Sequence, residues 1–237
     1  MIYLITDTHL GHRNMIKNCG RPERFTDIIF DNCRKIVKRD DLLIHLGDVA
    51  WNEANLQRFL KLPGRKILVR GNHDKKSTPY YLDAGFTLVV DQMVMTLQGV
   101  HILFSHAPQY AHTADINIHG HQHDLHCEDV FHRYWPLALE HMGYQPLPLD
   151  DHTVGVLQSW VKRGRNHADS LFLAMTRRSF DQHLGKKIYA TVQLPWDDAR
   201  FSQSYRIVDQ KAEQIRSEGS GFPSDMMLCW FQVESMV

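Results

Sequence analysis

The chain has 237 residues, of which 43% are apolar and 23% are charged, a composition typical of globular proteins. Lys plus Arg and Asp plus Glu number 27 each. This zero net charge argues against a general nucleic-acid or membrane-surface binder, although it leaves room for a local basic patch. Because no apolar run reaches 18 residues and no signal peptide is evident, we expect neither a transmembrane helix nor secretion. Four scattered cysteines without a C-x-x-C pair favour a reducing compartment, so the expected location is cytoplasmic.

Short strands and amphipathic helices alternate in the first half of the chain. The expected strands are Ile2–Thr6, Leu42–Leu46, Lys66–Arg70, Phe86–Val90, Met93–Leu97, His101–Ser105 and Asp115–His119. Helices are expected from a cap at Thr26 to about Arg39, after a cap at Asn52, and after Ser77. This alternation predicts βαβ units around a parallel sheet. A Gln98-Gly99 turn between two strands predicts antiparallel or mixed pairing there.

The composition changes near residues 155–166, where a polar stretch with several Lys and Arg residues indicates a solvated linker. Residues 1–157 are therefore expected to form one domain, and residues 158–237 a small C-terminal α+β extension. Within the extension, helices are expected at Ser170–Phe180 and Phe201–Ile215, and strands at Ile188–Leu194 and Met226–Val233. The extension is thus predicted to be a strand–helix–strand unit, with partner binding, dimerisation and covering of a site as its candidate roles.

Histidine is the unusual residue of this chain. Of 16 histidines, 14 lie in residues 1–157 and eight lie between His101 and His132. Since histidine titrates near neutrality and often binds metal, this crowding indicates a chemical role. His45 and His101 are different, because they lie inside apolar strands and are expected to be buried, hydrogen-bonded core residues.

Five short polar motifs occur in order, each at or just after the end of an expected strand. They are Asp7-Thr8-His9, Gly47-Asp48, Gly71-Asn72-His73-Asp74, Ser105-His106 and Gly120-His121-Gln122-His123. Because loops at the carboxyl ends of parallel strands share one edge of a sheet, all five are expected to converge. Taken singly, each has an ordinary structural explanation, such as an Asp that caps a turn or an Asn with positive φ. The ordered set indicates a metal site.

The motifs supply three side-chain oxygens and four imidazoles. These candidate ligands are Asp7, Asp48, Asn72, His9, His106, His121 and His123. Oxygen and nitrogen ligands without thiolate suit Mn²⁺, with Fe, Zn²⁺ and Ni²⁺ as alternatives. Seven ligands exceed the need of one ion with open positions, whereas two ions that share a carboxylate would use them all. The expected cofactor is therefore a pair of divalent metal ions.

The order D-x-H, G-D, G-N-H-D, H, G-H-x-H resembles the calcineurin-like metallophosphoesterase superfamily over about residues 1–157. Residues 11–14 and 133–150 are similar to small bacterial and phage members. The resemblance implies an α/β fold, a four-layer α/β/β/α sandwich of two mixed sheets flanked by helices. It also implies one ion held by Asp7, His9, Asp48 and His123, and a second held by Asp48, Asn72, His106 and His121.

Further residues are expected to act on the substrate. By the same resemblance, His73 faces the substrate and assists the departing oxygen, and the neighbouring Asp74 is expected to orient that imidazole. Four more residues are candidates for contacts to a substrate phosphate: His12, Arg13, Asn14 and Arg21. Ordinary loop capping is the alternative for these four.

The predicted function is hydrolysis of phosphate esters, in which a metal-bridging hydroxide attacks phosphorus in line. A phosphodiesterase is preferred, because a proton donor helps most when the leaving group is a poor alkoxide. The alternatives are a phosphomonoesterase or nucleotide pyrophosphatase with the same metal site, a nuclease, and a catalytically silent scaffold. The expected substrate is a nucleotide or similar small phosphate ester. No membrane partner is expected, and a nucleic-acid partner stays open.

Overall fold

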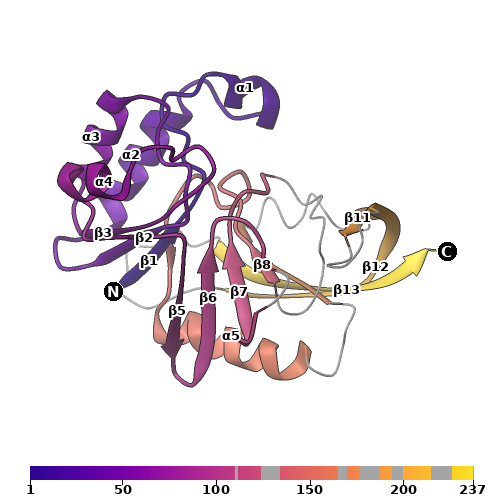
Figure 1. The fold of residues 1–237 in the computed structure, drawn as a ribbon. Helices are drawn as coiled ribbons and strands as arrows, with labels where there is room; N and C mark the ends of the chain where they lie inside the picture. Colours follow the sequence, from indigo (N-terminus) through magenta and orange to yellow (C-terminus); the bar gives the residue numbers. More distant parts are fainter. Residues whose placement is uncertain are drawn as a thin grey trace.

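A computed structural model describes residues 1–109, 112–123, 134–164, 170–176, 187–193, 200–214 and 226–236. Three sheets occur in these ranges, together with helices that lie mainly on two sides of the molecule (Figure 1). The first two sheets and their helices form the part expected to be a sandwich. The third sheet belongs to the C-terminal extension.

The first sheet has five strands in the order β4-β3-β2-β1-β9. Their bounds are Ile2–Ile5 (β1), Leu42–His45 (β2), Arg65–Val69 (β3), Leu88–Val90 (β4) and Leu147–Pro148 (β9). The first four strands are parallel and β9 is antiparallel to β1, so the sheet is mixed. The register sets Ile5 opposite His45 and His45 opposite Leu68, which brings the carboxyl ends of β1, β2 and β3 to one edge.

Helices follow the strands of this sheet, as the alternating pattern predicts. They are α1 (Asn14–Cys19), α2 (Phe25–Ile36), α3 (Glu53–Leu60) and α4 (Thr78–Ala84). Helix α2 buries Ile29, Phe30 and Cys33 on one face, which confirms the predicted amphipathic helix. The predicted cap at Asn52 is also confirmed, because its side chain accepts a backbone N–H group of α3. The predicted cap at Thr26 is wrong, because α2 begins at Phe25 and Thr26 lies inside it. Ser77 caps α4, since its hydroxyl accepts the Tyr80 N–H. The short helix α1 lies outside the sequence prediction.

The second sheet has the order β5-β6-β7-β8. Its strands are Gln92–Leu97 (β5), Val100–Ser105 (β6), Ile116–His119 (β7) and Tyr134–Pro136 (β8). Strands β5 and β6 form an antiparallel hairpin, whereas β6, β7 and β8 are parallel. The predicted turn is confirmed, because Gln98 and Gly99 have φ angles of 49° and 78°, and a two-residue type I′ hairpin turn requires positive φ at both positions.

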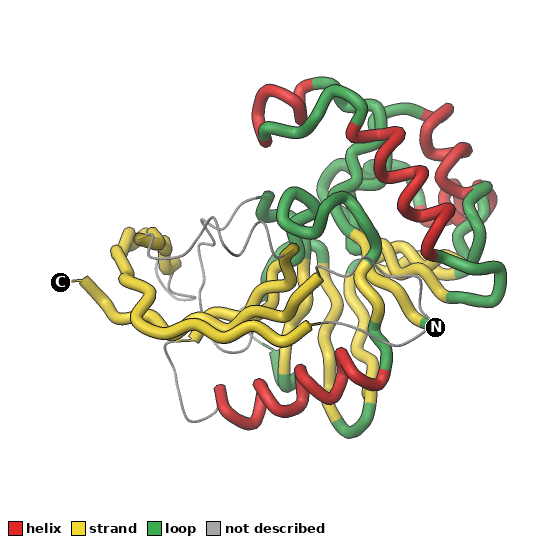
Figure 2. The backbone as a smooth tube through the Cα atoms, turned by 180° about the vertical axis from the view of Figure 1, so that it is seen from behind, coloured by secondary structure: helices red, strands yellow, loops and turns green. Residues whose placement is uncertain are grey.

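Side chains from both sheets meet in one buried core. Leu4, Ile44 and Leu68 from the first sheet and Phe104 and Ile118 from the second are fully buried members of it. Helices α2, α3 and α4 cover the first sheet, and α5 (Asp151–Gly164) lies along the second on the opposite side (Figures 1 and 2). The expected four-layer sandwich of two mixed sheets flanked by helices is confirmed, and it buries the apolar faces of both sheets.

Helix α5 occupies the stretch expected to be a solvated linker, so that expectation is wrong. Val154, Leu157 and Val161 recur at spacings of three and four and are all buried, which gives α5 an apolar face. Its first turn is stabilised by Asp150, whose carboxylate accepts the Thr153 N–H at 2.7 Å. The predicted boundary after residue 157 falls inside this helix. No helix in the described part of the chain is long and apolar enough to cross a membrane.

The C-terminal extension forms a third sheet, and the predicted strand–helix–strand unit is wrong. Antiparallel strands occur in the order β10-β13-β12-β11, with bounds Ser170–Thr176 (β10), Lys187–Gln193 (β11), Arg200–Gln214 (β12) and Met226–Met236 (β13). The two expected strands are confirmed, whereas the described parts of both expected helices are strands. Phe201, Tyr205 and Ile207 also fit an alternating pattern, and β12 pairs with β11 and β13. Sheet pairing therefore outweighs the helical spacing.

Phe59 on α3 connects the helix layer to the first sheet. Its fully buried ring meets the ring of His45 edge-on at 5.4 Å and lies 6.4 Å from that of Phe86. Phe59→Ala should leave a cavity and lower the free energy of unfolding by about 3–5 kcal/mol, measured by urea unfolding. Leu82→Ala, which shortens a 41%-exposed side chain on α4, is the control. This substitution should change the free energy of unfolding by about 0.5 kcal/mol or less. Equal effects of the two substitutions would contradict the role given to Phe59.

Candidate metal centre

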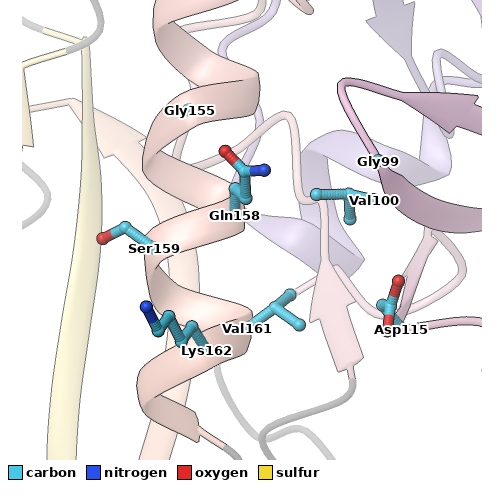
Figure 3. A pocket seen from close by; sticks show the side chains of 8 residues that line it. All are labelled: Gly99, Val100, Asp115, Gly155, Gln158, Ser159, Val161 and Lys162. Atoms are coloured by element: carbon cyan, nitrogen blue, oxygen red, sulfur yellow. The ribbon is translucent and has the colours of Figure 1, made fainter.

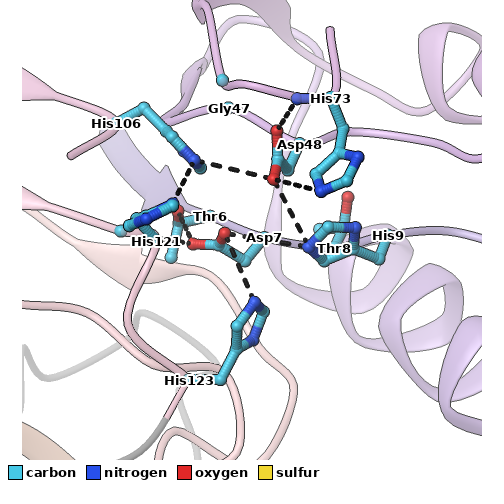
Figure 4. Close-up of polar contacts among 12 residues, drawn as sticks. Thr6, Asp7, Thr8, His9, Gly47, Asp48, His73, His106, His121 and His123 are labelled. Carbon is cyan, nitrogen blue, oxygen red and sulfur yellow. Dashed lines mark hydrogen bonds and ion pairs between the residues drawn. The ribbon is translucent and has the colours of Figure 1, made fainter. Parts of the chain in front are cut away.

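The five sequence motifs meet at one edge of the sandwich. The loops after β1, β2 and β3 carry Asp7, Asp48 and Asn72, and the loops after β6 and β7 carry His106 and His121. Both sheets therefore contribute side chains to the same space, as Figure 4 shows. The structure brings all seven predicted ligand residues together there.

The backbone at this edge has an unusual conformation. Four of the predicted ligands have left-handed φ angles between 42° and 69°: Asp7, His9, Asp48 and His121. Ordinary side chains rarely adopt this region. Hydrogen bonds between loops hold it, since the Asp7 N–H donates to the Gly47 carbonyl and the His9 N–H to the Asp48 carbonyl, each at 2.9 Å. Such strain persists only where the surroundings enforce it, and it concentrates at functional sites.

Two glycines allow the acidic side chains to approach the loops closely. A Cβ atom on Gly71 would lie 2.2 Å from Asp48 Oδ1, and one on Gly120 would lie 2.2 Å from Asp7 Oδ2. Both distances are far inside van der Waals contact, so a side chain at either position would displace a carboxylate. The glycines of these motifs therefore make room for the two acids.

Asp7 is buried, and only one of its two carboxylate oxygens accepts hydrogen bonds. Its Oδ2 accepts hydrogen bonds from the Thr6 hydroxyl (2.5 Å) and the His121 N–H (2.8 Å). Its Oδ1 has no hydrogen-bond partner and faces His123 Nε2 at 3.7 Å and His9 Nε2 at 3.9 Å. Leaving a buried carboxylate oxygen unpaired is costly, and a metal ion among these three atoms would satisfy it.

Asp48 has the same arrangement at the centre of the cluster. Its Oδ1 accepts the His73 N–H at 2.8 Å, whereas its Oδ2 lies 3.5 Å from His9 Nε2 and 3.6 Å from His106 Nε2. Burial raises the pKa of the Asp48 carboxyl, although the His106 imidazole opposes the effect. Because burial disfavours the ionised form, a cation beside Oδ2 would stabilise the carboxylate, and Asp48 lies where two ions could share it.

Three more side chains bring ligand atoms together beside Asp48. Asn72 Oδ1 lies 2.8 Å from His106 Nε2 and 3.1 Å from His121 Nδ1, and the two ring nitrogens are 3.1 Å apart. Ligand atoms around one ion with bonds of about 2.1 Å lie roughly 3–3.5 Å from one another. The spacings between these atoms are therefore close to those that one metal ion would require.

Hydrogen bonds determine which nitrogen of two imidazoles faces the cluster. His106 Nδ1 donates to the Leu46 carbonyl at 2.8 Å, which leaves the lone pair of Nε2 directed into the cluster. His123 Nδ1 lies 3.2 Å from Glu140 Oε1, so its Nε2 is likewise directed inward. Partners of this kind orient metal-binding imidazoles and fix their tautomer.

Burial also favours the neutral form of two imidazoles of the cluster, His9 and His121. Burial, together with the charges of His123 and Arg21, lowers the pKa of His9 to about 2. Burial and the nearby His106 lower the pKa of His121. Because only a neutral imidazole has a lone pair available for a metal, both rings are in their ligand form near neutral pH.

Arg21 does not face a substrate, so that prediction is wrong. Its side chain is fully buried and donates to Glu140 Oε1 (2.8 Å) and to the carbonyls of Thr8 (3.1 Å) and Asp7 (2.8 Å). Burial raises the pKa of the Glu140 carboxyl, but the hydrogen bond from His123 and the charge of Arg21 have the larger combined effect. The pKa of Glu140 is therefore lowered overall. Arg21, Glu140 and His123 thus form a chain of polar contacts that positions a predicted ligand.

Asp74 supports Asp48 instead of the His73 ring, so its predicted role is also wrong. Its Oδ2 accepts the backbone N–H groups of Asp48 (2.7 Å) and Gly71 (2.9 Å), and its Oδ1 accepts the Val49 N–H (3.2 Å). The Asp74 carboxylate is directed toward the loops after β2 and β3, because the three backbone N–H groups that it accepts belong to these loops. Asp74 thereby joins the loop after β2 to the loop after β3.

His73 lies at the open side of the cluster. Its ring is 41% exposed, and Nε2 is 4.0 Å from Asp48 Oδ2. His12 lies nearby and stacks on Trp51, with 3.7 Å between ring centroids and 3° between ring planes. The positions of both residues are compatible with contact to a substrate. The other two candidates are exposed at the start of α1 and stay predictions: Arg13 and Asn14.

The two predicted core histidines differ from each other. His45 is fully buried, accepts the Gly47 N–H at 3.1 Å through Nδ1, and lies 2.9 Å from the Thr8 hydroxyl through Nε2, as predicted. Burial lowers the pKa of His45 to about 3. His101 is exposed, with Nδ1 3.0 Å from the Thr96 hydroxyl, so the prediction for it is wrong. Within β6 only residue 101, near the start of the strand, is exposed, whereas the other residues of the strand are buried.

A separate cavity of about 620 Å³ lies beside α5 (Figure 3). It is lined by Gly99, Val100, Asp115, Gly155, Gln158, Ser159, Val161 and Lys162. None of the predicted ligands lines it, so this cavity is distinct from the candidate metal centre.

The fold and the cluster together define a class of protein. It is an α/β sandwich whose edge carries buried Asp and His groups able to hold metal, notably Asp7 with His9 and His123, and Asp7 with Asp48 and His106. The chain belongs to the calcineurin-like phosphoesterase superfamily, whose domain matches residues 1–135.

Several known proteins are similar to this chain. It is 30% identical over 165 residues to the uncharacterized protein MJ1445 of Methanocaldococcus jannaschii, covering 63% of this chain and 87% of that protein. The crystal structure of AQ665, a protein of unknown function from Aquifex aeolicus, matches with 28% identity and a TM-score of 0.54. That match covers 66% of this chain and 98% of the other. A novel archaeal phosphodiesterase matches with 19% identity and a TM-score of 0.34, over 55% and 75% of the two chains.

Glu140 should be needed for full metal affinity, because it holds both His123 and Arg21. Glu140→Gln is expected to weaken Mn²⁺ binding by about 10- to 100-fold, measured by isothermal titration calorimetry. Glu23→Gln, at an exposed carboxylate, is the matched control and should leave the affinity unchanged. Equal affinities of the wild type and Glu140→Gln would contradict the positioning role.

His45 should make the stability of the metal-free protein depend on pH. The unfolded chain protonates this ring below about pH 6.5, whereas the folded chain does so only near pH 3, so stability is full above pH 6.5 and falls as the pH is lowered. Lowering the pH from 7 to 5 should reduce the free energy of unfolding by about 2 kcal/mol through this ring, measured by urea unfolding. In His45→Gln, the free energy of unfolding should fall correspondingly less over the same pH range. An identical pH dependence in both proteins would show that the neutral ring is not responsible.

Proposed function

We propose that this protein is a phosphodiesterase that uses two divalent metal ions, most suitably Mn²⁺, to hydrolyse a nucleotide-like phosphate ester. The observation that carries the proposal is the pair of buried carboxylates, Asp7 and Asp48. Each has one oxygen held by donors and the other directed toward imidazole nitrogens. One ion would be held by Asp7, His9, Asp48 and His123, and the other by Asp48, Asn72, His106 and His121. This mixed oxygen and nitrogen set fits such ions, and superfamily membership supports it.

The protein's own groups would divide the work of catalysis. When bound, two ions supply an activated water and neutralise charge on the phosphate. Arg21 and Asp74 hold the loops that carry the ligands, through the contacts to Asp7 and Asp48 described above. His73, half exposed and 4.0 Å from Asp48, is placed to hold a proton for the departing oxygen.

The environment of Arg21 supports a diester as the substrate. A phosphate monoester carries more negative charge than a diester and benefits more from a free guanidinium. Arg21 lies close to the cluster, but its donors are directed to Glu140 and to the carbonyls of Thr8 and Asp7. Arg21 is therefore not available to a dianionic group, which favours the less charged diester as the substrate.

The first test compares two substrates on the same protein. Metal-stripped protein reloaded with Mn²⁺ should hydrolyse bis(p-nitrophenyl) phosphate, and Asp48→Asn should lower turnover by more than about 100-fold while weakening binding of both ions. Hydrolysis rate and metal stoichiometry are both measured, with Asp83→Asn as an exposed control. Turnover of p-nitrophenyl phosphate alone would make the protein a phosphomonoesterase. Turnover of neither substrate would refute the proposal.

The role of His73 is tested by the choice of leaving group. His73→Ala should leave metal stoichiometry unchanged and lower turnover of an alkyl diester, such as a thymidine dinucleotide, by about 10²- to 10⁴-fold. The loss should be much smaller for bis(p-nitrophenyl) phosphate, whose leaving group needs no proton. Loss of metal from His73→Ala, or equal losses for both substrates, would show that the assigned role is wrong.

A further inference from the structure

Trp51 is an exposed aromatic side chain at the edge of the candidate metal centre. It lies three residues after Asp48, and its ring centroid is 5.8 Å from that of His73. The indole is 54% exposed, although large apolar side chains are usually covered. The Trp51 ring therefore lies beside His73, the residue proposed to act on the substrate, and is open to solvent.

One face of Trp51 is covered and the other is open. His12 stacks on the indole, nearly parallel to it, with 3.7 Å between the ring centroids. An indole covered on both faces would expose little more than its edge, so an exposed fraction of 54% requires a free second face. The pair of rings thus presents a flat surface of the kind on which planar groups stack.

The backbone holds this surface in a fixed position relative to the predicted ligands. The Leu10 N–H donates to the Val49 carbonyl and the Trp51 N–H donates to the Leu10 carbonyl, each at 3.0 Å. These bonds join the loop that carries His12 to the loop that carries Trp51. Asn52 then caps α3 directly after the indole. A platform fixed in this way loses little conformational freedom when a ligand binds.

We propose that Trp51, backed by His12, is a stacking site for a planar aromatic group of the substrate, with a nucleobase as the best-fitting chemical class. This inference rests on the proposed function, because the base is taken to belong to a phosphate ester that the neighbouring cluster hydrolyses. The metal centre would hold the phosphate, and the indole would select esters that carry a base. Stacking of a base on an aromatic side chain corresponds to about 5- to 150-fold in affinity.

The test compares two ligands that differ only in the base. Adenosine 5′-monophosphate and ribose 5-phosphate are measured as competitors of bis(p-nitrophenyl) phosphate hydrolysis by the Mn²⁺-loaded protein. The wild type should bind the adenosine compound about 5- to 150-fold more tightly. Trp51→Ala should reduce this ratio to about one through weaker binding of the adenosine compound alone, and Trp51→Phe should keep most of it. Val94→Ala, at another exposed apolar residue, is the control and should leave the ratio unchanged.

A second measurement does not depend on catalysis. Saturation-transfer NMR with adenosine and metal-free protein should show contact with the base in the wild type and in Trp51→Phe, and none in Trp51→Ala. A ratio near one in the wild type, with hydrolysis intact, would overturn the stacking site and leave the proposed function standing. A ratio unchanged by Trp51→Ala would also overturn it. Absence of both hydrolysis and phosphate binding would refute the proposed function and this inference together.

Discussion

The rest of the structure depends on holding two acidic side chains, Asp7 and Asp48, close together at a buried edge. Carboxylates in such a place repel each other and lose hydration, so each needs donors on one oxygen and a positive partner on the other. The Thr6 hydroxyl and the backbone N–H groups of His73 and His121 provide the donors. The second oxygens face imidazole nitrogens, an arrangement in which a metal ion could be the positive partner.

Much of the surrounding architecture serves this pair. Left-handed backbone angles turn the side chains inward, and Gly71 and Gly120 leave room for the carboxylates. Asp74 joins two loops of the first sheet, and Arg21 connects the Asp7 carbonyl to Glu140. Because ligands come from both sheets, the cluster exists only while the sheets keep their relative position. The shared core, which is close-packed, enforces that position.

The ligand candidates were predictable because each belongs to a short motif at the end of a strand, and parallel strands bring such ends together. The role of Arg21 was not predictable, because its partner Glu140 is 119 residues away and no local pattern marks it. His101 shows the same limit on a smaller scale, since an apolar strand does not reveal which of its residues the rest of the fold leaves exposed. Trp51 is part of no motif, and only its exposure and its stacking on His12 make it a candidate.

By itself, the sequence determined the strands β1 to β7, the helices α2 to α4, the cap of α3, the hairpin turn and the set of metal-ligand candidates. These features depend on residues close together in the chain or on the order of motifs. Tertiary structure alone decided which polar residues face the open site and which support it from behind, as with His73 and Asp74. It also decided that residues 200–214 form a strand, because neighbouring strands satisfy its backbone. The burial of a side chain and the pairing of distant strands cannot be predicted from the local spacing of apolar residues in the sequence.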